Sequence, residues 1–155
     1  MTETAKGSRA PRKPSELRDV YEFLEEVRLR PGMWVRRSSL QHLDSMLVGY
    51  RVASEIHGID ESFEFWNGGP FAEWLWKRLS MPYPSALGWA IEIERAAEIA
   101  EVPAMEMFFS FLDEFRSERG GRQATEEGQP SPAPRSETRS LPATVNDGGD
   151  LPGQS

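Results

Sequence analysis

The segment from Tyr21 to Trp34, YEFLEEVRLRPGMW, constrains the fold most, because it contains both a helix and the signal that ends it. Pro31 cannot continue a helix and disfavours the helical conformation at Arg30, and Gly32 permits a turn. We therefore expect a helix that ends near Arg30 and a corner where Met33 and Trp34 fold back. The expected buried stripe is Leu17, Val20, Leu24 and Val27, and the expected polar positions are Glu16, Asp19, Glu22, Glu25 and Glu26.

The rest of the chain predicts four further helices. The second is capped by Ser38 or Ser39, where Ser38 and Gln41 fit a capping box, and it ends at Gly58. Residues 59–70 are expected to form a long loop. The third helix ends before Pro82, the fourth is capped by Ser85, and the fifth starts at Pro103 and ends at Gly120 and Gly121.

Apolar residues recur at helical spacing in each of these four segments. The fold class is therefore expected to be all-α, a compact bundle of about five helices. The residues expected to face the core are Leu40, Leu43, Met46, Leu47, Tyr50, Ala53 and Ile56; Phe71, Trp74, Leu75 and Leu79; Leu87, Trp89, Ala90, Ile91, Ile93, Ala96, Ala97 and Ala100; and Met105, Phe108, Phe109, Phe111, Leu112 and Phe115.

The two ends of the chain differ from this pattern. Residues 1–14 are short, polar and unpatterned, and residues 119–155 are rich in Gly, Pro, Ser and Thr. Such compositions bury too little apolar surface to offset the loss of chain entropy. We expect a disordered leader at 1–14, a helical domain at 15–118 and a disordered tail at 119–155.

Acidic residues dominate the expected domain. The whole chain carries a net charge of −7, while residues 15–118 hold nineteen acidic and ten basic side chains. This excess disfavours nucleic acid and anionic membranes and favours a basic protein partner, although it also serves solubility alone. There is no cysteine, no apolar run long enough to span a membrane and no signal-peptide core, so a cytoplasmic location is expected.

The stretch LEEVRLRPGM resembles a segment near the start of the ATPase domain of the gyrase B subunit. The matching residues are Glu25, Val27, Arg28, Arg30, Pro31, Gly32 and Met33, with Trp34 in the place of a tyrosine. In that family the resemblance implies Mg-ATP binding, through an E-x-x-D-N helix and a D-x-G-x-G turn. Neither motif occurs here. We interpret the match as a shared local structure, an acidic helix that ends at an Arg-Pro-Gly sequence.

A looser pattern over residues 21–117 resembles a group of short uncharacterised bacterial proteins. It comprises R-P-G-M-[YW], G-Y-R, a third helix with tryptophan, S-x-x-G-W and F-F-x-x-L-D-E-F, which are here residues 30–34, 49–51, Trp74, 85–89 and 108–115. The small, acidic character of this group is similar to that of immunity proteins, which neutralise toxins. The resemblance implies no enzymatic activity.

No catalytic motif, metal motif or phosphate-binding loop is visible in the sequence. His42 and His57 are the only histidines, and they lie fifteen residues apart on one expected helix, too far to share a metal ion. We therefore expect no catalytic residue, no metal and no cofactor, and a protein that is not an enzyme.

Two surfaces are candidates for binding. The first would hold a basic protein partner through Glu94, Glu98, Glu101, Trp66 and Trp76; the alternative reading is a solvated acidic face and buried tryptophans. The second would hold a small ligand or nucleotide through Arg28, Arg30, Trp34, Arg36 and Arg37; the alternative is pairing of these arginines with nearby glutamates. The leading expectation is a protein-binding domain of immunity or antitoxin type, against a nucleotide-binding domain or an accessory structural subunit, and the oligomeric state is left open.

Overall fold

The computed structural model describes residues 9–127, with side chains as far as Arg122. Residues 1–8 and 128–155, which make up most of the expected leader and tail, lie outside this range. Within residues 9–127 every regular element is helical, which confirms the all-α prediction. The elements are the short 3₁₀ turns η1 (Pro14–Glu16) and η2 (Arg36–Ser38) and the helices α1 (Val20–Leu29), α2 (Pro31–Trp34), α3 (Leu40–Ile56), α4 (Pro70–Arg78), α5 (Trp89–Ala100) and α6 (Ala104–Glu127).

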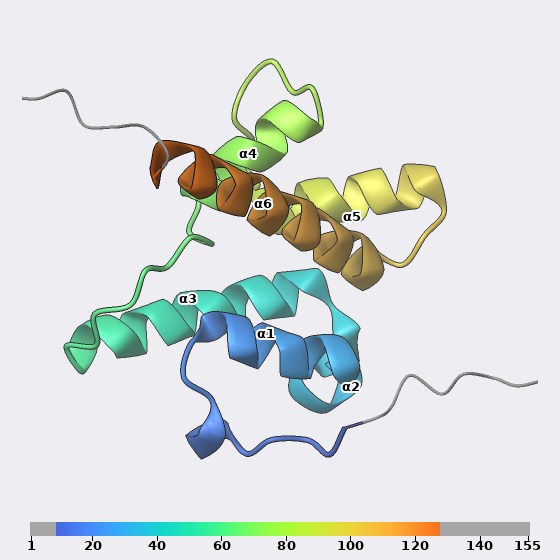
Figure 1. Cartoon of the computed structure of the whole chain (residues 1–155). Helices are drawn as coiled ribbons and strands as arrows, with labels where there is room; N and C mark the ends of the chain where they lie inside the picture. The colour runs from blue at the N-terminus through green and yellow to red at the C-terminus, as the bar shows by residue number, and fades with distance from the viewer. Residues whose placement is uncertain (1–8, 128–155) are drawn as a thin grey trace, which may run out of the picture.

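The helices form two groups (Figure 1). Helices α1, α2 and α3 lie together, and α4, α5 and α6 lie together on the other side of α3. Helices α5 and α6 form an antiparallel hairpin, and α3 packs against both. The connection from Ile56 to Pro70 leaves the far end of α3 and leads back to α4.

The predicted corner is present, with α1 ending at Leu29 and Pro31 opening the single turn α2. Trp34 folds back as expected and packs its ring edge-on against Phe23, with ring centroids 5.6 Å apart. Met33, however, is exposed. The corner therefore turns the chain towards α3 and buries only one of the two side chains expected there.

Two predicted helix boundaries differ from the structure, and a third is confirmed for one of its two candidate caps. The cap of α3 is Ser39, whose side chain accepts from the His42 N–H, so the box with Ser38 is absent. Helix α5 begins at Trp89 after Gly88 with φ of 88°, and Ser85 bonds to Glu92 instead of capping. Helix α6 continues through Gly120 to Glu127, so the two glycines do not end it, and residues 119–127 of the expected disordered tail are helical.

Aromatic rings fill the core between α4, α5, α6 and the 59–70 connection. The Phe71 ring lies within 6.0 Å, centroid to centroid, of Phe65, Trp74, Trp89, Phe108 and Phe115. The indole N–H of Trp89 donates to the carbonyl of Phe65 at 2.9 Å. This bond ties the connection to α5 and satisfies a buried donor. Phe65 is thereby fixed, and its neighbours in the connection are fixed with it.

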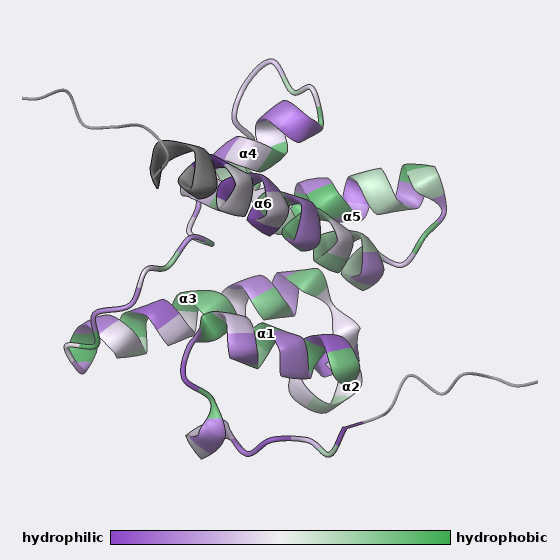
Figure 2. Cartoon of the chain, in the orientation of Figure 1, coloured by the Kyte–Doolittle hydropathy of each residue, from purple (hydrophilic) through white to green (hydrophobic). Residues whose placement is uncertain are grey.

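Several residues expected in the core are not buried. Met46, Ala53, Ile56, Leu87 and Ala100 are exposed, and Tyr50, Trp74, Leu79, Ile91 and Ala96 are half-buried. On α3 the inner side packs against α5 and α6, and Met46, Ala53 and Ile56 lie on a side that these two helices do not cover. The ribbon of α3 accordingly shows hydrophobic bands on a helix that borders solvent (Figure 2).

Glu26, expected on the polar face of α1, is buried with 1% of its surface exposed. The Arg12 side chain donates to it at 3.1 Å, and an Arg9 nitrogen lies 2.6 Å from the same carboxylate oxygen. Residues 9–14 of the expected disordered leader therefore pack against α1. The arginines of this segment neutralise a buried carboxylate that would otherwise be costly.

Candidate functional site

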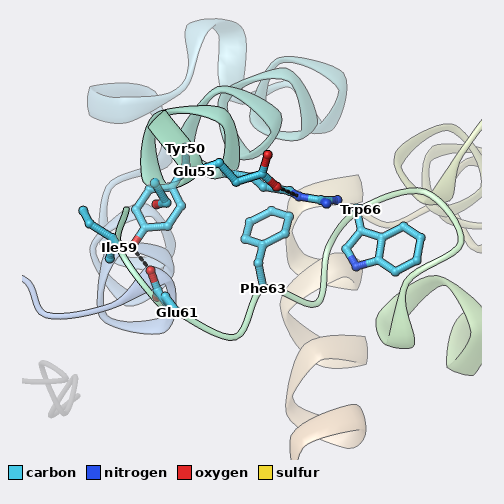
Figure 3. A pocket seen from close by; sticks show the side chains of 8 residues that line it. Tyr50, Glu55, Ile59, Glu61, Phe63 and Trp66 are labelled. Carbon is cyan, nitrogen blue, oxygen red and sulfur yellow. Dashed lines mark hydrogen bonds and ion pairs between the residues drawn. The ribbon is translucent and has the colours of Figure 1, made fainter. Parts of the chain in front are cut away.

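A cleft of about 200 Å³ lies between the last two turns of α3 and the connection that follows it (Figure 3). Its walls are three aromatic rings, Tyr50, Phe63 and Trp66, together with Ile59. Its charged groups are two carboxylates, Glu55 and Glu61, and one guanidinium, that of Arg51. The cleft is thus aromatic and carries one more negative charge than positive.

Tyr50 lies on α3, about one turn after the buried Leu47. It therefore faces the same inner side of the helix as Leu47. Its hydroxyl donates to Glu61, and burial raises the pKa of this hydroxyl, with the hydrogen bond to the Glu61 carboxylate raising it further. The phenol therefore stays protonated at neutral pH and keeps donating. The backbone N–H of Val20 donates to the other oxygen of Glu61 at 2.6 Å.

A second carboxylate of the connection, Glu64, is also anchored on α1. It accepts from the Tyr21 hydroxyl and forms an ion pair with Arg119 of α6. Burial and the Glu64 carboxylate together raise the pKa of Tyr21, so this donor too stays protonated. Glu61 and Glu64 together hold the connection against α1, and the intervening Phe63 is directed into the cleft.

Trp66 forms the end wall of the cleft, with 41% of its surface exposed. The turn after it needs glycine: Gly68 has φ of 82°, and a side-chain carbon at Gly69 would lie 2.9 Å from the Trp66 carbonyl oxygen. The Arg51 guanidinium lies over the Trp66 ring, 5.5 Å from its centroid, and the Arg51 Nε bonds Glu55 at 2.9 Å. The cleft therefore already stacks one guanidinium on an aromatic ring beside a carboxylate.

The remainder of the cleft has the same chemistry. Phe63 stacks on Tyr50, with centroids 6.4 Å apart and planes within 20°. The faces of such rings attract cations, and carboxylates attract them further. The open part of the cleft, beside Glu61, Phe63 and Ile59, is suited to the end of a positively charged side chain.

The structure separates the residues of the predicted acidic surface. Trp76 is buried, with 7% exposed, because it is turned into the core of α4 and α6, so its prediction as an exposed anchor is wrong. Glu94 accepts from Gln41 of α3 at 2.7 Å, and Glu98 is exposed on α5. Glu101 is exposed at the residue that ends α5. Of the predicted set, only Trp66 lines the cleft.

The predicted arginine corner is also divided. Arg28 points to α6, where it bonds Asp113 at 2.9 and 2.8 Å and lies over the Phe109 ring. Trp34 is half-buried, and its indole nitrogen has no hydrogen-bond partner among the described residues. Arg30 is half-buried at the junction of α1 and α2, and Arg36 and Arg37 are exposed in η2. Arg28 is thus paired with a carboxylate, but with a distant aspartate and not with one of the nearby glutamates that the alternative named.

Sequence reasoning missed Tyr50, Arg51, Glu55, Glu61 and Phe63 as cleft residues. They lie on a helix and on a loop with no repeating pattern, so spacing alone does not bring them together. The aromatic residues Phe63, Phe65 and Trp66 of the connection were the one available signal, since successive side chains of an extended segment point to opposite sides. Phe65 is buried and its neighbour Trp66 lines the cleft, as an extended segment requires, but Phe63 lines the cleft too, although that pattern places it on the side of Phe65.

Among residues 9–127, no group of three or more His, Asp or Glu residues could hold a metal ion. His42 and His57 stand at opposite ends of α3. In the same residues, none of the helices has the length and apolar character required to cross a membrane.

No protein-family model, curated protein or solved structure matches the chain. The resemblances described from the sequence therefore stay predictions, and the site is interpreted from its own geometry.

Proposed function

We propose that this chain is a protein-binding domain that receives a cationic side chain of a basic partner in the cleft between α3 and the 59–66 segment. One observation carries the proposal: the cleft combines three aromatic rings with an excess of carboxylate, and it already stacks the Arg51 guanidinium on Trp66. Because Arg51 already holds the Trp66 ring and Glu55, a second guanidinium or ammonium group would meet the Phe63 ring and the Glu61 carboxylate in the rest of the cleft. The acidic character of the domain supports a basic partner.

A single cationic side chain in such a cleft gives a weak interaction. Cation–π contacts at exposed sites contribute about 0.5–1 kcal/mol each, and a dissociation constant near 1 mM corresponds to about −4 kcal/mol. The partner therefore makes further contacts outside the cleft, and the exposed Glu98 and Glu101 on α5 are available for them. An immunity or antitoxin role, in which the partner is a basic toxin, is a specific form of this proposal. The cytoplasmic location expected from the sequence stays a prediction.

Affinity capture from the host with matched variants tests this function. The wild-type chain should retain a basic protein at low salt and lose it at high salt, because exposed charge pairs are screened. Trp66→Ala should reduce capture of that protein at least several-fold, since it removes the end wall of the cleft. Tyr83→Ala is the control, because Tyr83 is an aromatic side chain with 78% exposure that does not line the cleft.

The outcome against the proposal is equal capture by all three chains, or no captured protein at either salt concentration. A protein lost with Glu98→Lys but kept with Trp66→Ala would locate binding on α5 instead. The nucleotide alternative makes a different prediction: ATP should raise the melting temperature of the wild-type chain, and an Arg30→Ala, Arg36→Ala double variant should lose that shift.

A further inference from the structure

The outer face of α3, opposite the cleft, is exposed and almost entirely apolar. Val48, Val52 and Ile56 have 50%, 48% and 74% of their surface exposed. These residues are spaced by four, so they form one ridge along the helix. The adjacent row, also spaced by four, consists of the small residues Ser45, Gly49 and Ala53, all exposed. From residue 45 to residue 56 neither row holds a charged side chain, and Asp44, half-buried one turn before Val48, precedes the ridge.

Beside the small-residue row is an apolar groove of about 410 Å³. Its floor is formed by Met46, Gly49, Tyr50 and Ala53 of α3, and its wall by Pro14, Leu17, Phe23 and Trp34, with the Asp19 carboxylate as the one charged group of the lining. The groove exists because Gly49 and Ala53 have little or no side chain at the positions where a larger residue would fill it. A ridge and a groove of matching chemistry therefore lie next to each other on the same helix.

Charge differs between the two ends of this face. Arg36 and Arg37 are exposed just before α3, and the Arg36 carbonyl lies 3.0 Å from the ring nitrogen Nδ1 of His42 on the first turn. Glu55 and Asp60 are exposed at the other end, where the helix dipole is also negative. The face thus has two exposed arginines before its beginning, the half-buried Asp44 on its second turn, an apolar middle and acidic groups at its end.

We propose that the occupant of this face is a second copy of the chain, with the two α3 helices packed antiparallel around a two-fold axis near Gly49. In that arrangement the Val48, Val52 and Ile56 ridge of each copy enters the groove of the other, and residue 45 of one copy lies opposite residue 53 of the other. A ridge and a groove on one surface are the requirement for an isologous pair. Small residues at the crossing let the backbones approach closely.

The charges at the two ends of the α3 face favour an antiparallel over a parallel orientation of the two helices. They also favour a second copy of the chain as the occupant. Antiparallel packing places the basic end of one α3 against the acidic end of the other and opposes the helix dipoles, whereas parallel packing places like charges together. A pair through any charged acidic surface of this domain would be opposed by repulsion. The α3 face is uncharged at its centre, so it escapes that repulsion.

Sedimentation velocity across a concentration series measures the pair directly. The wild-type chain should shift from 17.5 kDa towards twice that mass as its concentration rises. Val52→Glu, on the ridge, and Ala53→Phe, which fills the groove, should each stay monomeric at concentrations where the wild type is paired. Ile99→Glu is the control, since Ile99 is 86% exposed on α5. Circular dichroism verifies that each variant keeps its helical content.

Disulfide trapping tests the register, because the chain contains no cysteine of its own. Gly49→Cys should cross-link to itself on oxidation, as residue 49 meets its own copy near the axis. Ser45→Cys and Ala53→Cys chains should cross-link with each other when mixed, and Ile99→Cys should not cross-link.

A wild-type chain that is monomeric at every concentration overturns the proposal and leaves the face to a different protein. Pairing that survives in both Val52→Glu and Ala53→Phe also overturns it. The cleft is tested separately through Trp66, which lines the cleft and not the groove, although Tyr50 lines both.

Discussion

At the scale of single residues, Glu26 has the largest mismatch between its sequence context and its environment. It lies among four other acidic residues in and around α1, yet it is buried under Arg9 and Arg12. Burial raises its pKa, but hydrogen bonds from the side chain and backbone of Arg12 and the charges of both arginines outweigh it, so the net pKa is lowered. The sequence could not indicate this, because the arginines lie in a segment that reads as a polar leader.

Glu26 should make folding stability depend on pH in the acid range. Its folded pKa is below the ordinary 4.5, so its contribution is fully present above that value and is lost as the pH falls through the folded pKa. Glu26→Gln should lower the melting temperature at pH 7 and flatten the loss of stability below pH 4.5, measured by thermal unfolding from pH 7 to pH 3. Glu98→Gln, at an exposed glutamate, is the control. An unchanged acid slope in Glu26→Gln would contradict the burial of a charged group.

At the scale of elements, helices were predictable where apolar spacing and a strong stop signal coincided. The Pro31 corner, the end of α3 before Gly58 and the start of α6 after Pro103 follow the sequence closely. Boundaries that depend on weak signals were not predictable. Ser85 has the chemistry of a cap but bonds to Glu92, and two glycines did not stop α6. The apolar spacing of α3 was correct, but spacing does not say which side of a helix the rest of the chain will cover.

The continuation of α6 predicts the effect of an alanine at position 120. A side-chain carbon at Gly120 would meet nothing within 4 Å, and Gly120 lies in the interior of the helix. Gly120→Ala should therefore stabilise the domain by about 0.5–1 kcal/mol, measured by urea unfolding, since alanine favours helix over glycine. Ser117→Ala, at an exposed position one turn earlier, provides the comparison. A loss of stability in Gly120→Ala would mean that the helix ends at the glycines.

At the scale of the whole molecule, the all-α class followed from periodicity and length, whereas the cleft did not. It depends on contacts between segments far apart in sequence: Glu61 with Val20 and Tyr50, and Glu64 with Tyr21 and Arg119. These anchors bring a loop and a helix together around three aromatic rings. The acidic composition pointed to a basic partner, but the residues proposed to meet it came mainly from the three-dimensional arrangement.

The most direct measurement of the central claim is an NMR titration of the indole N–H signals with a blocked Gly-Arg-Gly peptide. The five tryptophans give separate probes, and the Trp66 signal is assigned by its loss in Trp66→Ala. We expect a saturable shift of the Trp66 signal that is larger than the shifts of the other four signals, and no comparable shift with blocked Gly-Glu-Gly. Equal shifts with both peptides, or no shift at Trp66, would contradict recognition of a cationic side chain by this cleft.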